Sequence, residues 1–263
     1  MPALYAHLRF GEEVIKLLPA QLVKTIDKHP EAFALGTQGP DILFYHKPMK
    51  ANELRARGTF LHTLTGKQFF EEQKTIPVKD NQALTSYLCG FLCHFTLDTL
   101  CHKYIDDHST DEVSHGKIES EFDKFLLKKD GLPIRGYNTA TPILSRNGSA
   151  EACAKVVGAP IEEIFLSVRT MRKINGMFSK KCEPFHWLAH IVLKIAGMER
   201  KFGDMFLHRK DDPLCKEINE VLYEKFQQAL PSAKDLIEEF FTKETLENEL
   251  FRYNFSGIIT TEE

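Results

Sequence analysis

Three ionisable side chains recur every four residues within a long apolar segment of this 263-residue chain. His94, Asp98 and His102 lie in or beside the run from Tyr87 to Cys101, which is rich in Leu, Phe and Cys. Because each residue of an α-helix turns by about 100° and rises by about 1.5 Å, the three side chains share one narrow helix face. A carboxylate and two imidazoles are costly to bury among apolar residues unless something pairs with them. A divalent metal ion can do so, since zinc accepts imidazole and carboxylate ligands.

The length of this helix face indicates more than one ion. His94 and His102 are about 12 Å apart along the helix axis. That distance is too great for both side chains to reach a single ion. We therefore expect the three residues to belong to a cluster of two or more metals.

A second pair with the same spacing follows a predicted loop that runs from Asp106 to Ser114. Ser114 is a favourable N-cap, so we expect a helix with His115 in its first turn and Glu119 one turn later. A single His-x3-Glu pair is usually a surface feature of a helix. The number and order of such residues, rather than any one of them, indicate a metal site.

Three further candidate ligands lie upstream. His7 follows Ala6 near the start of the chain, and His62 lies in the segment Phe-Leu-His-Thr. Asp41 follows Gly39 and Pro40, so we expect it at a turn or a helix start, where a carboxylate can be held rigidly. In chain order, the candidates are His7, Asp41, His62, His94, Asp98, His102, His115 and Glu119.

This ordered set resembles the zinc-dependent phospholipase C family, and more closely its leaderless bacterial branch. The single-strand-specific zinc nucleases share the fold and ligand order of that family. The resemblance covers roughly residues 4–127 of this chain. It rests on the segments Ala6-His-Leu-Arg-Phe-Gly11, Gly39-Pro-Asp41, His62, Gly90-Phe-Leu-Cys-His-Phe-Thr-Leu-Asp98, His102 and His115-Gly-Lys-Ile-Glu-Ser-Glu-Phe-Asp123.

The resemblance implies a role for each candidate, with two or three zinc ions in all. It implies a first zinc held by Asp41, His62, His94 and Asp98. It implies a second zinc, its shell completed by water, held by His102, His115 and Glu119. His7 would help to hold a third ion, which Asp98 would bridge to the first. Secreted members also bind that ion through an amino-terminal tryptophan, whereas the only tryptophan here is Trp187.

Composition predicts a soluble enzyme. With 43% hydrophobic and 27% charged residues, the chain is long enough to bury one full core. The first residues contain no basic stretch followed by an apolar one, so we expect no secretory signal and a cytoplasmic location. The six cysteines show no CxxC spacing, which favours free thiols in a reducing compartment. The apolar helix near 84–105 reaches membrane-spanning length, but its ionisable residues favour a core helix without a transmembrane segment.

The charge balance bears on possible partners. The formal net charge is −3, the pI is about 6.4 and no basic tract stands out. Proteins that bind nucleic-acid backbones usually present a basic face, so we expect no stable nucleic-acid complex. A polybasic membrane-binding segment is likewise missing from the sequence.

Helical spacing of apolar residues extends through nearly the whole chain, and strand-like alternation is lacking. It predicts helices at 5–18, 20–34, 60–74, 82–106, 115–128, 149–157, 161–176, 185–203, 213–229 and 232–250. Together with the resemblance, this pattern predicts an all-α, single-domain multi-helix bundle of the zinc phospholipase C and zinc nuclease type over residues 1–263.

Within this domain we expect the ligands between residues 7 and 119 and a helical second half at 149–263. Residues 129–148, which begin with a stretch rich in turn formers, would connect the two halves; a loop at the mouth of the site is the alternative.

Several other residues receive a structural interpretation. His186 and His190 have the spacing of two ligands but no nearby acid in the same register, so we interpret them as structural. His46 and His108 lie in polar or loop-like surroundings, where a solvated imidazole is expected. An aromatic group near the end of the chain is expected to pack in the core: Phe240, Phe241, Phe251, Tyr253 and Phe255.

The predicted function is hydrolysis of a phosphoester bond in a phosphodiester or phospholipid. Metal ions would activate water for in-line attack on phosphorus, and Asp41 would act as general base. Cleavage on the glycerol side of the phosphate is implied by the resemblance alone. The alternatives are a nuclease or nucleotidase on the same cluster, a structural metalloprotein whose coordination positions are closed by protein atoms, and a metal-free helical interaction protein. The last would leave Asp98 buried without a partner.

Overall fold

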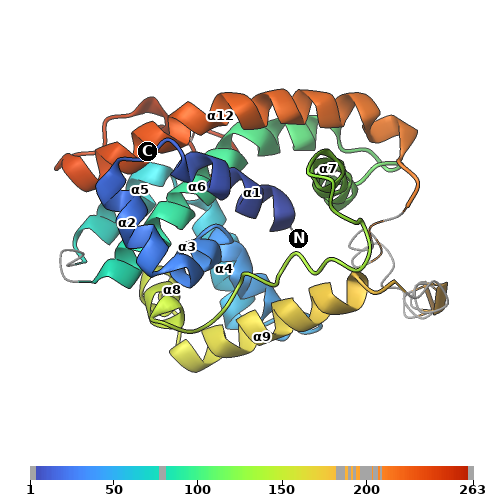
Figure 1. The fold of residues 1–263 in the computed structure, drawn as a ribbon, viewed down its shortest axis with the longest axis horizontal. Coiled ribbons are helices and arrows are strands. Elements are labelled where there is room, and N and C mark those ends of the chain that lie inside the picture. The colour runs from blue at the N-terminus through green and yellow to red at the C-terminus, as the bar shows by residue number, and fades with distance from the viewer. Residues whose placement is uncertain are drawn as a thin grey trace.

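The computed structural model describes residues 4–76, 81–181 and 209–259, together with residues 187, 188, 191, 194, 195, 203 and 207. The described part of the chain is helical, with isolated β-bridges and no β-strand, so the all-α prediction is confirmed. The elements, shown in Figure 1, are α1 (Leu4–Ile15), α2 (Ala20–Lys28), α3 (Pro30–Gly36), η1 (Gly39–Tyr45), α4 (Glu53–Thr63), α5 (Gly66–Lys74), α6 (Gln82–His108), α7 (His115–Lys129), α8 (Ser149–Val157), α9 (Ile161–Phe178), η3 (Pro213–Cys215), α12 (Lys216–Thr242) and η4 (Glu249–Arg252).

Helix α6 is the central element of the fold. It contacts α1, α2, α3, α7, α8, α12 and η1, and an unbroken run from Ser86 to Thr99 is buried. In Figure 1, α12 crosses the top of the molecule and α9 the bottom, with α1, α3, α4 and α6 between them. The expectation of a core helix is confirmed. None of the helices described combines the length and apolar composition that crossing a bilayer requires.

Helices α3 and α6 cross with their backbones in contact. A Cβ atom on Gly36 would lie 2.1 Å from the carbonyl oxygen of Tyr87, and one on Gly90 would lie 2.2 Å from that of Phe33. Only glycine fits at both positions. This close crossing fixes the chain just before η1 against α6, and so brings Asp41 toward the histidines of α6.

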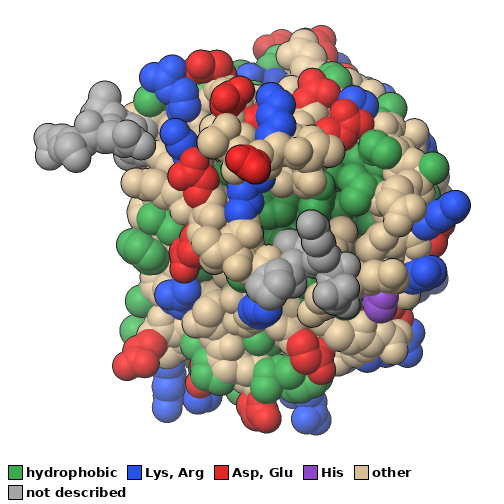
Figure 2. Space-filling model, turned by 90° about the vertical axis from the view of Figure 1, so that its left-hand side faces the viewer, with side chains coloured by type: hydrophobic (Ala, Val, Ile, Leu, Met, Phe, Trp, Pro, Cys, Tyr) green, Lys and Arg blue, Asp and Glu red, His purple; other side chains and the backbone are tan. Residues whose placement is uncertain are grey.

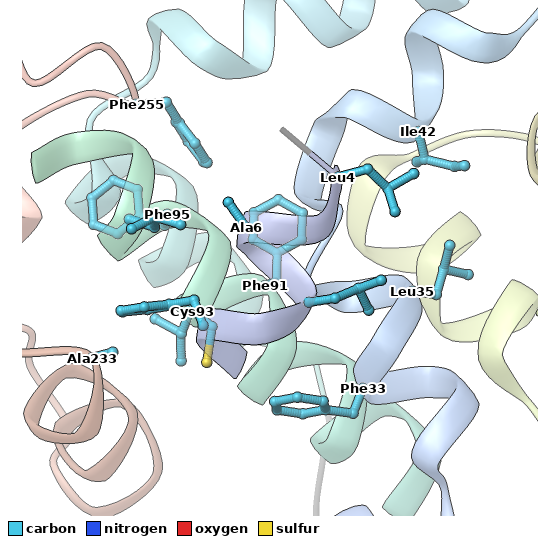
Figure 3. Packing of buried hydrophobic residues seen from close by; sticks show 14 of the residues in the cluster. Leu4, Ala6, Phe33, Leu35, Ile42, Phe91, Cys93, Phe95, Ala233 and Phe255 are labelled. Carbon is cyan, nitrogen blue, oxygen red and sulfur yellow. The ribbon is translucent and has the colours of Figure 1, made fainter. Parts of the chain in front are cut away.

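Both halves of the chain contribute to one hydrophobic core. Figure 3 shows Phe95 and Phe255 on one side of this core and Leu4 and Ile42 on the other, with Phe91 between them. Among the aromatic residues expected to pack, Phe240, Phe251 and Phe255 are buried, and Phe241 packs against the core while partly exposed. Tyr253 is half-buried.

Several predicted helix boundaries were wrong. The helix expected at 20–34 is interrupted at His29, and α3 begins at Pro30, whose fixed φ suits the first turn of a helix. The helix expected at 60–74 divides into α4 and α5, because Thr65 caps α5 through a capping box with Gln68. Conversely, α12 continues through Pro231, where the sequence predicted a break. The helix expected at 185–203 falls mostly outside the described residues.

The segment between α7 and α8 passes close to the start of α1. The ring of Tyr137 meets that of Tyr5 edge-on, with 6.2 Å between centroids. Further along, Arg146 and Asn147 both donate hydrogen bonds to Glu31 of α3. The segment joins α7 to α8 and also lies near His7, because Tyr5 is two residues from His7.

Candidate metal centre

Five elements bring the predicted ligands into one cluster. The ligands are His7 of α1, Asp41 of η1, His62 of α4, His94, Asp98 and His102 of α6, and His115 and Glu119 of α7. Asp41 lies in the first turn of η1, and Ser114 caps α7 by accepting the amide hydrogen of Lys117. Both local predictions are confirmed.

Asp98 is the centre of the cluster. Its Oδ1 atom lies 3.2 Å from Nε2 of His7 and 3.3 Å from Nε2 of His102. Its Oδ2 atom lies 2.9 Å from Nε2 of His94. Burial raises the pKa of the Asp98 carboxyl, but the imidazoles of His102, His94 and His7 outweigh this effect and hold the pKa well below its ordinary value. Asp98 is therefore a carboxylate surrounded by three ring nitrogens.

One group of ligand atoms gathers around Asp98 and Asp41. One atom each from His7, Asp41, His94 and Asp98 lies within 4.8 Å of the others. His62 joins this group through Asp41, whose Oδ1 lies 3.1 Å from its Nε2. Oδ2 of Asp41 lies 3.9 Å from Nε2 of His94. His7 thus lies among the residues expected to hold the first ion, and its ring stacks on that of His94 with centroids 4.3 Å apart.

A second group is formed by His102, His115 and Glu119. Oε1 of Glu119 lies 3.5 Å from Nε2 of His102 and 3.3 Å from Nε2 of His115. Burial lowers the pKa of His102, but Asp98 and Glu119 raise it more, to about 10. Burial raises the pKa of Glu119, but hydrogen bonding to the imidazoles of His102 and His115 outweighs this effect and holds the pKa well below its ordinary value. The second group adjoins the first through the contact between His102 and Asp98.

Backbone carbonyls orient two of the imidazoles. Nδ1 of His62 lies 2.7 Å from the carbonyl oxygen of Gly58, and Nδ1 of His94 lies 3.2 Å from that of Thr37. Each contact places the proton on Nδ1 and leaves Nε2 directed at the carboxylates. Such outer partners fix the tautomer of metal-binding histidines.

Asp123 anchors the beginning of α1. Its two carboxylate oxygens accept the backbone N–H groups of Tyr5 and Ala6, at 3.0 Å and 2.7 Å. These amides belong to the first turn of α1 and have no partner within the helix. Burial raises the pKa of Asp123 to about 7, against the opposing effect of the two amide donors. Because Glu119 lies one turn earlier on α7, one helix both supplies a candidate ligand and fixes the turn that carries His7.

Aromatic rings form one wall of the cluster. Phe44 stacks on His62, with centroids 5.6 Å apart, and Phe255 lies 5.3 Å from His62 and 6.0 Å from His94. No sequence pattern predicted that Phe255 reaches this wall, since it lies far from every candidate ligand along the chain. Its apolar ring strengthens electrostatic interactions in the cluster by excluding water.

The remaining histidines and the cysteines lie elsewhere. His108 is exposed, as expected, but His46 is buried, so the expectation of a solvated ring was wrong. His186 and His190 lie outside the described residues. Five cysteines are described, and all are free and buried: Cys89, Cys93, Cys101, Cys153 and Cys215.

Binding of divalent metal ions accounts for the arrangement of the cluster better than hydrogen bonding between its side chains does. Nε2 of His94 and Oδ2 of Asp98 are close in space, yet neither atom makes a hydrogen bond, and Nδ1 of His7 also lacks a partner. Buried polar atoms normally find partners. Ring nitrogens and carboxylate oxygens that converge without hydrogen-bond geometry are suited to share a cation, and their types match zinc.

Fold and site together define a helical protein with a buried histidine–carboxylate centre suited to several divalent ions. The family model for zinc-dependent phospholipase C matches residues 6–175, more than half of the chain. The chain therefore belongs to the zinc-dependent phospholipase C family. No curated protein and no solved structure matches it significantly.

Proposed function

We propose that this protein is a zinc-dependent phosphodiester hydrolase of the phospholipase C type. The observation that carries the proposal is the position of Asp98, with three imidazole nitrogens within 3.3 Å of its oxygens and a second histidine–carboxylate group beside it. Adjacent cation sites of this kind suit a reaction in which charge develops on several oxygens of one phosphate group.

The ligands would divide as the resemblance implies. Asp41, His62, His94 and Asp98 would hold one zinc, and His102, His115 and Glu119 a second. His7 would hold a third together with Asp98. When bound, the ions would withdraw charge from the phosphate oxygens and lower the pKa of a bound water toward neutrality.

Asp41 is the proposed general base. It lies at the start of η1, held between His62 on one side and His94 on the other. An oxygen of Asp41 that is not bound to metal would accept the proton of the attacking water. Phe44 and Phe255 would exclude bulk water from the side of His62.

Partial exposure favours catalysis over a purely structural role. The side chain of His115 is 35% exposed, and those of His62 and His102 are 17% and 14% exposed. His94 and Asp98, by contrast, are almost completely buried. A structural zinc site is normally closed by protein ligands, whereas a catalytic one keeps an open position. The cluster is therefore most open to solvent at His115 and closed at His94 and Asp98.

The second candidate function is that of a nuclease or nucleotidase. It is favoured because the same metal centre could act on any phosphodiester. On the face shown in Figure 2, Lys and Arg side chains are interspersed with Asp and Glu, and no continuous basic surface lies there. This distribution, with a net charge of −3, favours a lipid or small phosphodiester over a nucleic-acid strand.

We also propose that the protein works in a reducing compartment such as the cytoplasm. The described cysteines are free and buried, whereas secreted proteins commonly pair their cysteines.

The experiment is to purify the protein without chelators, measure bound metal by elemental analysis, and assay three substrates. We expect at least two zinc equivalents and hydrolysis of phosphatidylcholine and bis-nitrophenyl phosphate in preference to single-stranded DNA. Asp41→Asn should abolish hydrolysis, and Asp27→Asn, which alters an exposed carboxylate on α2, should not. Fewer than half an equivalent of metal, with no uptake of added zinc, would refute the proposal; preferential cleavage of DNA would favour the nuclease.

A further inference from the structure

Asp106 extends the line of ionisable residues along α6 by one more turn. It follows His102 by four residues, as His102 follows Asp98 and Asp98 follows His94. The sequence pattern placed Asp106 at a boundary, as the last residue of the helix predicted at 82–106 and the first of the loop before α7, whereas α6 continues to His108. Asp106 therefore lies on the helix face that carries the candidate ligands.

The Asp106 carboxylate contacts a candidate ligand from its outer side. Oδ1 of Asp106 lies 2.7 Å from Nδ1 of His115, while Nε2 of the same ring faces Glu119 at 3.3 Å. The two nitrogens thus have separate partners, one outside the cluster and one within it. A carboxylate at Nδ1 fixes the proton on that nitrogen and directs the lone pair of Nε2 toward a metal.

The connection between α6 and α7 holds the two residues in register. The amide of Thr110 donates to the carbonyl oxygen of Val113 at 2.8 Å, and the Thr110 hydroxyl accepts the amides of Glu112 and Val113. Val113 is buried, and Ser114 caps α7. This compact turn brings the last turn of α6 against the first turn of α7.

The outer partner of His115 differs from those of the first group. His62 and His94 contact neutral backbone carbonyls, whereas His115 contacts a carboxylate. The first group also contains two carboxylates, Asp41 and Asp98, but the second contains only Glu119. A divalent ion in the second group would therefore be less well neutralised by its own ligands, and Asp106 supplies a further negative charge beside it.

From this geometry we propose that Asp106 is a positioning residue that holds His115 in the Nε2-binding tautomer and raises the metal affinity of the second group. The inference rests on the proposed function, because it assumes that this group binds a metal. Asp106 itself touches neither metal nor substrate. It acts through the imidazole of His115 and through its charge.

Asp107 provides a matched control. It is the next residue of α6, is exposed like Asp106, and pairs with Lys103 at 3.0 Å on the outer surface of the helix. Asp107→Asn changes the net charge by the same amount as Asp106→Asn without touching a ligand. Asp106→Ala removes both the charge and the hydrogen-bond acceptor, whereas Asp106→Asn retains an acceptor oxygen.

The test is a zinc titration against a competing chelator, with cobalt(II) substitution as a spectroscopic readout. We expect Asp106→Ala to weaken one zinc equivalent by about 10- to 100-fold, Asp106→Asn to weaken it less, and Asp107→Asn to match wild type. The cobalt d–d bands should change for the weakened equivalent and keep their wild-type form for the others. Because Asp106 is exposed, the metal-free variants should unfold at the wild-type temperature.

The two proposals fail in different ways. A wild-type protein that binds less than half an equivalent of metal, with no uptake of added zinc, contradicts the proposed function. A wild-type protein that binds two or more, with Asp106→Ala of unchanged affinity and spectrum, overturns the role of Asp106. Equal weakening in Asp107→Asn would also overturn it, since surface charge alone would then explain the effect.

Discussion

The α-carbon of Gly39 faces the imidazole of His94 so closely that a Cβ atom there would lie 2.2 Å from Cδ2 and 2.7 Å from Nε2 of the ring. Gly39 also has a positive φ of 50°, a conformation that other residues adopt at a cost. It lies two residues before Asp41. Because Gly39 has no side chain, the turn that carries Asp41 can pack directly against the ring of His94, a second candidate ligand.

Gly39→Ala should displace His94 and lower both stability and metal content. We expect a loss of about 1 kcal/mol from the left-handed backbone and roughly a further 1–3 kcal/mol from overpacking. Gly131→Ala is the control, because Gly131 also has a positive φ but no atom within 4 Å of its Cβ position. Thermal unfolding and elemental analysis measure the two effects. Equal zinc content and equal unfolding temperatures in both variants would contradict the role given to Gly39.

Asp98→Asn should damage the centre more than His7→Ala. Asp98 contacts three imidazoles, whereas His7 contacts Asp98 alone among the carboxylates that the structure describes. Replacing the carboxylate by an amide leaves the imidazoles and any bound cations with less negative charge to neutralise them. We expect activity to fall by more than about 100-fold, beyond the effect of losing an outer partner, together with a lower unfolding temperature. Wild-type activity in Asp98→Asn would exclude the central role of this residue.

Asp123→Asn should weaken the attachment of α1 and the position of His7. The two N–H groups contact different oxygens of Asp123, and an amide replaces one of these oxygens by an NH2 group, which cannot accept. We therefore expect a loss of about 0.5–2 kcal/mol and a lower zinc content. Asn81→Ala is the control. Asn81 lies thirteen residues before His94 and caps α6 by accepting a hydrogen bond from the backbone N–H of Leu84. It should cost similar stability without loss of zinc. If Asn81→Ala lost as much zinc as Asp123→Asn, general destabilisation would be sufficient to explain the loss, and Asp123 would have no specific effect on the position of His7.

The buried thiols should resist alkylation in the folded protein. Burial raises the pKa of Cys101 and Cys153 to about 12 and that of Cys215 to about 11. The reactive thiolate is therefore scarce at pH 8. Mass spectrometry after iodoacetamide treatment should find these positions labelled only when urea unfolds the chain. Rapid labelling of Cys101 without urea would mean that α6 opens locally.

The regular spacing along α6 made the centre partly predictable from sequence. Helix periodicity alone is enough to select His94, Asp98 and His102 as candidate ligands, because they share one helix face and their neighbours are apolar. Asp106 belongs to the same register, but it was not selected as part of the site, because the polar residues around it obscured the end of the helix, which was predicted at 106. His7, Asp41 and His62 were selected as candidate ligands because of their order along the chain, which the family shares.

Contacts between distant segments were not predictable. Asp123 reaches the amide of Tyr5 across 118 positions of the chain, and no local pattern links the two. The crossing of Gly36 on Gly90 depends on how two helices pack, which propensity does not encode. The break before Pro30 was visible in the sequence and missed, whereas α12 tolerates Pro231 because tertiary packing overrides local preference.

All the candidate ligands precede residue 120, and none of the described residues of α8, α9 and α12 is among them. Ions bound there would act as cross-links within the first part of the chain, joining α1 to α6 across 91 positions between His7 and Asp98. A cross-link that closes so long a loop reduces the conformational freedom of the unfolded chain. Removing the ions should therefore speed amide hydrogen exchange in α1, η1 and α4. The amides of α9 and α12 should remain protected from exchange. In this protein the metal would control the cooperativity of unfolding as well as the chemistry.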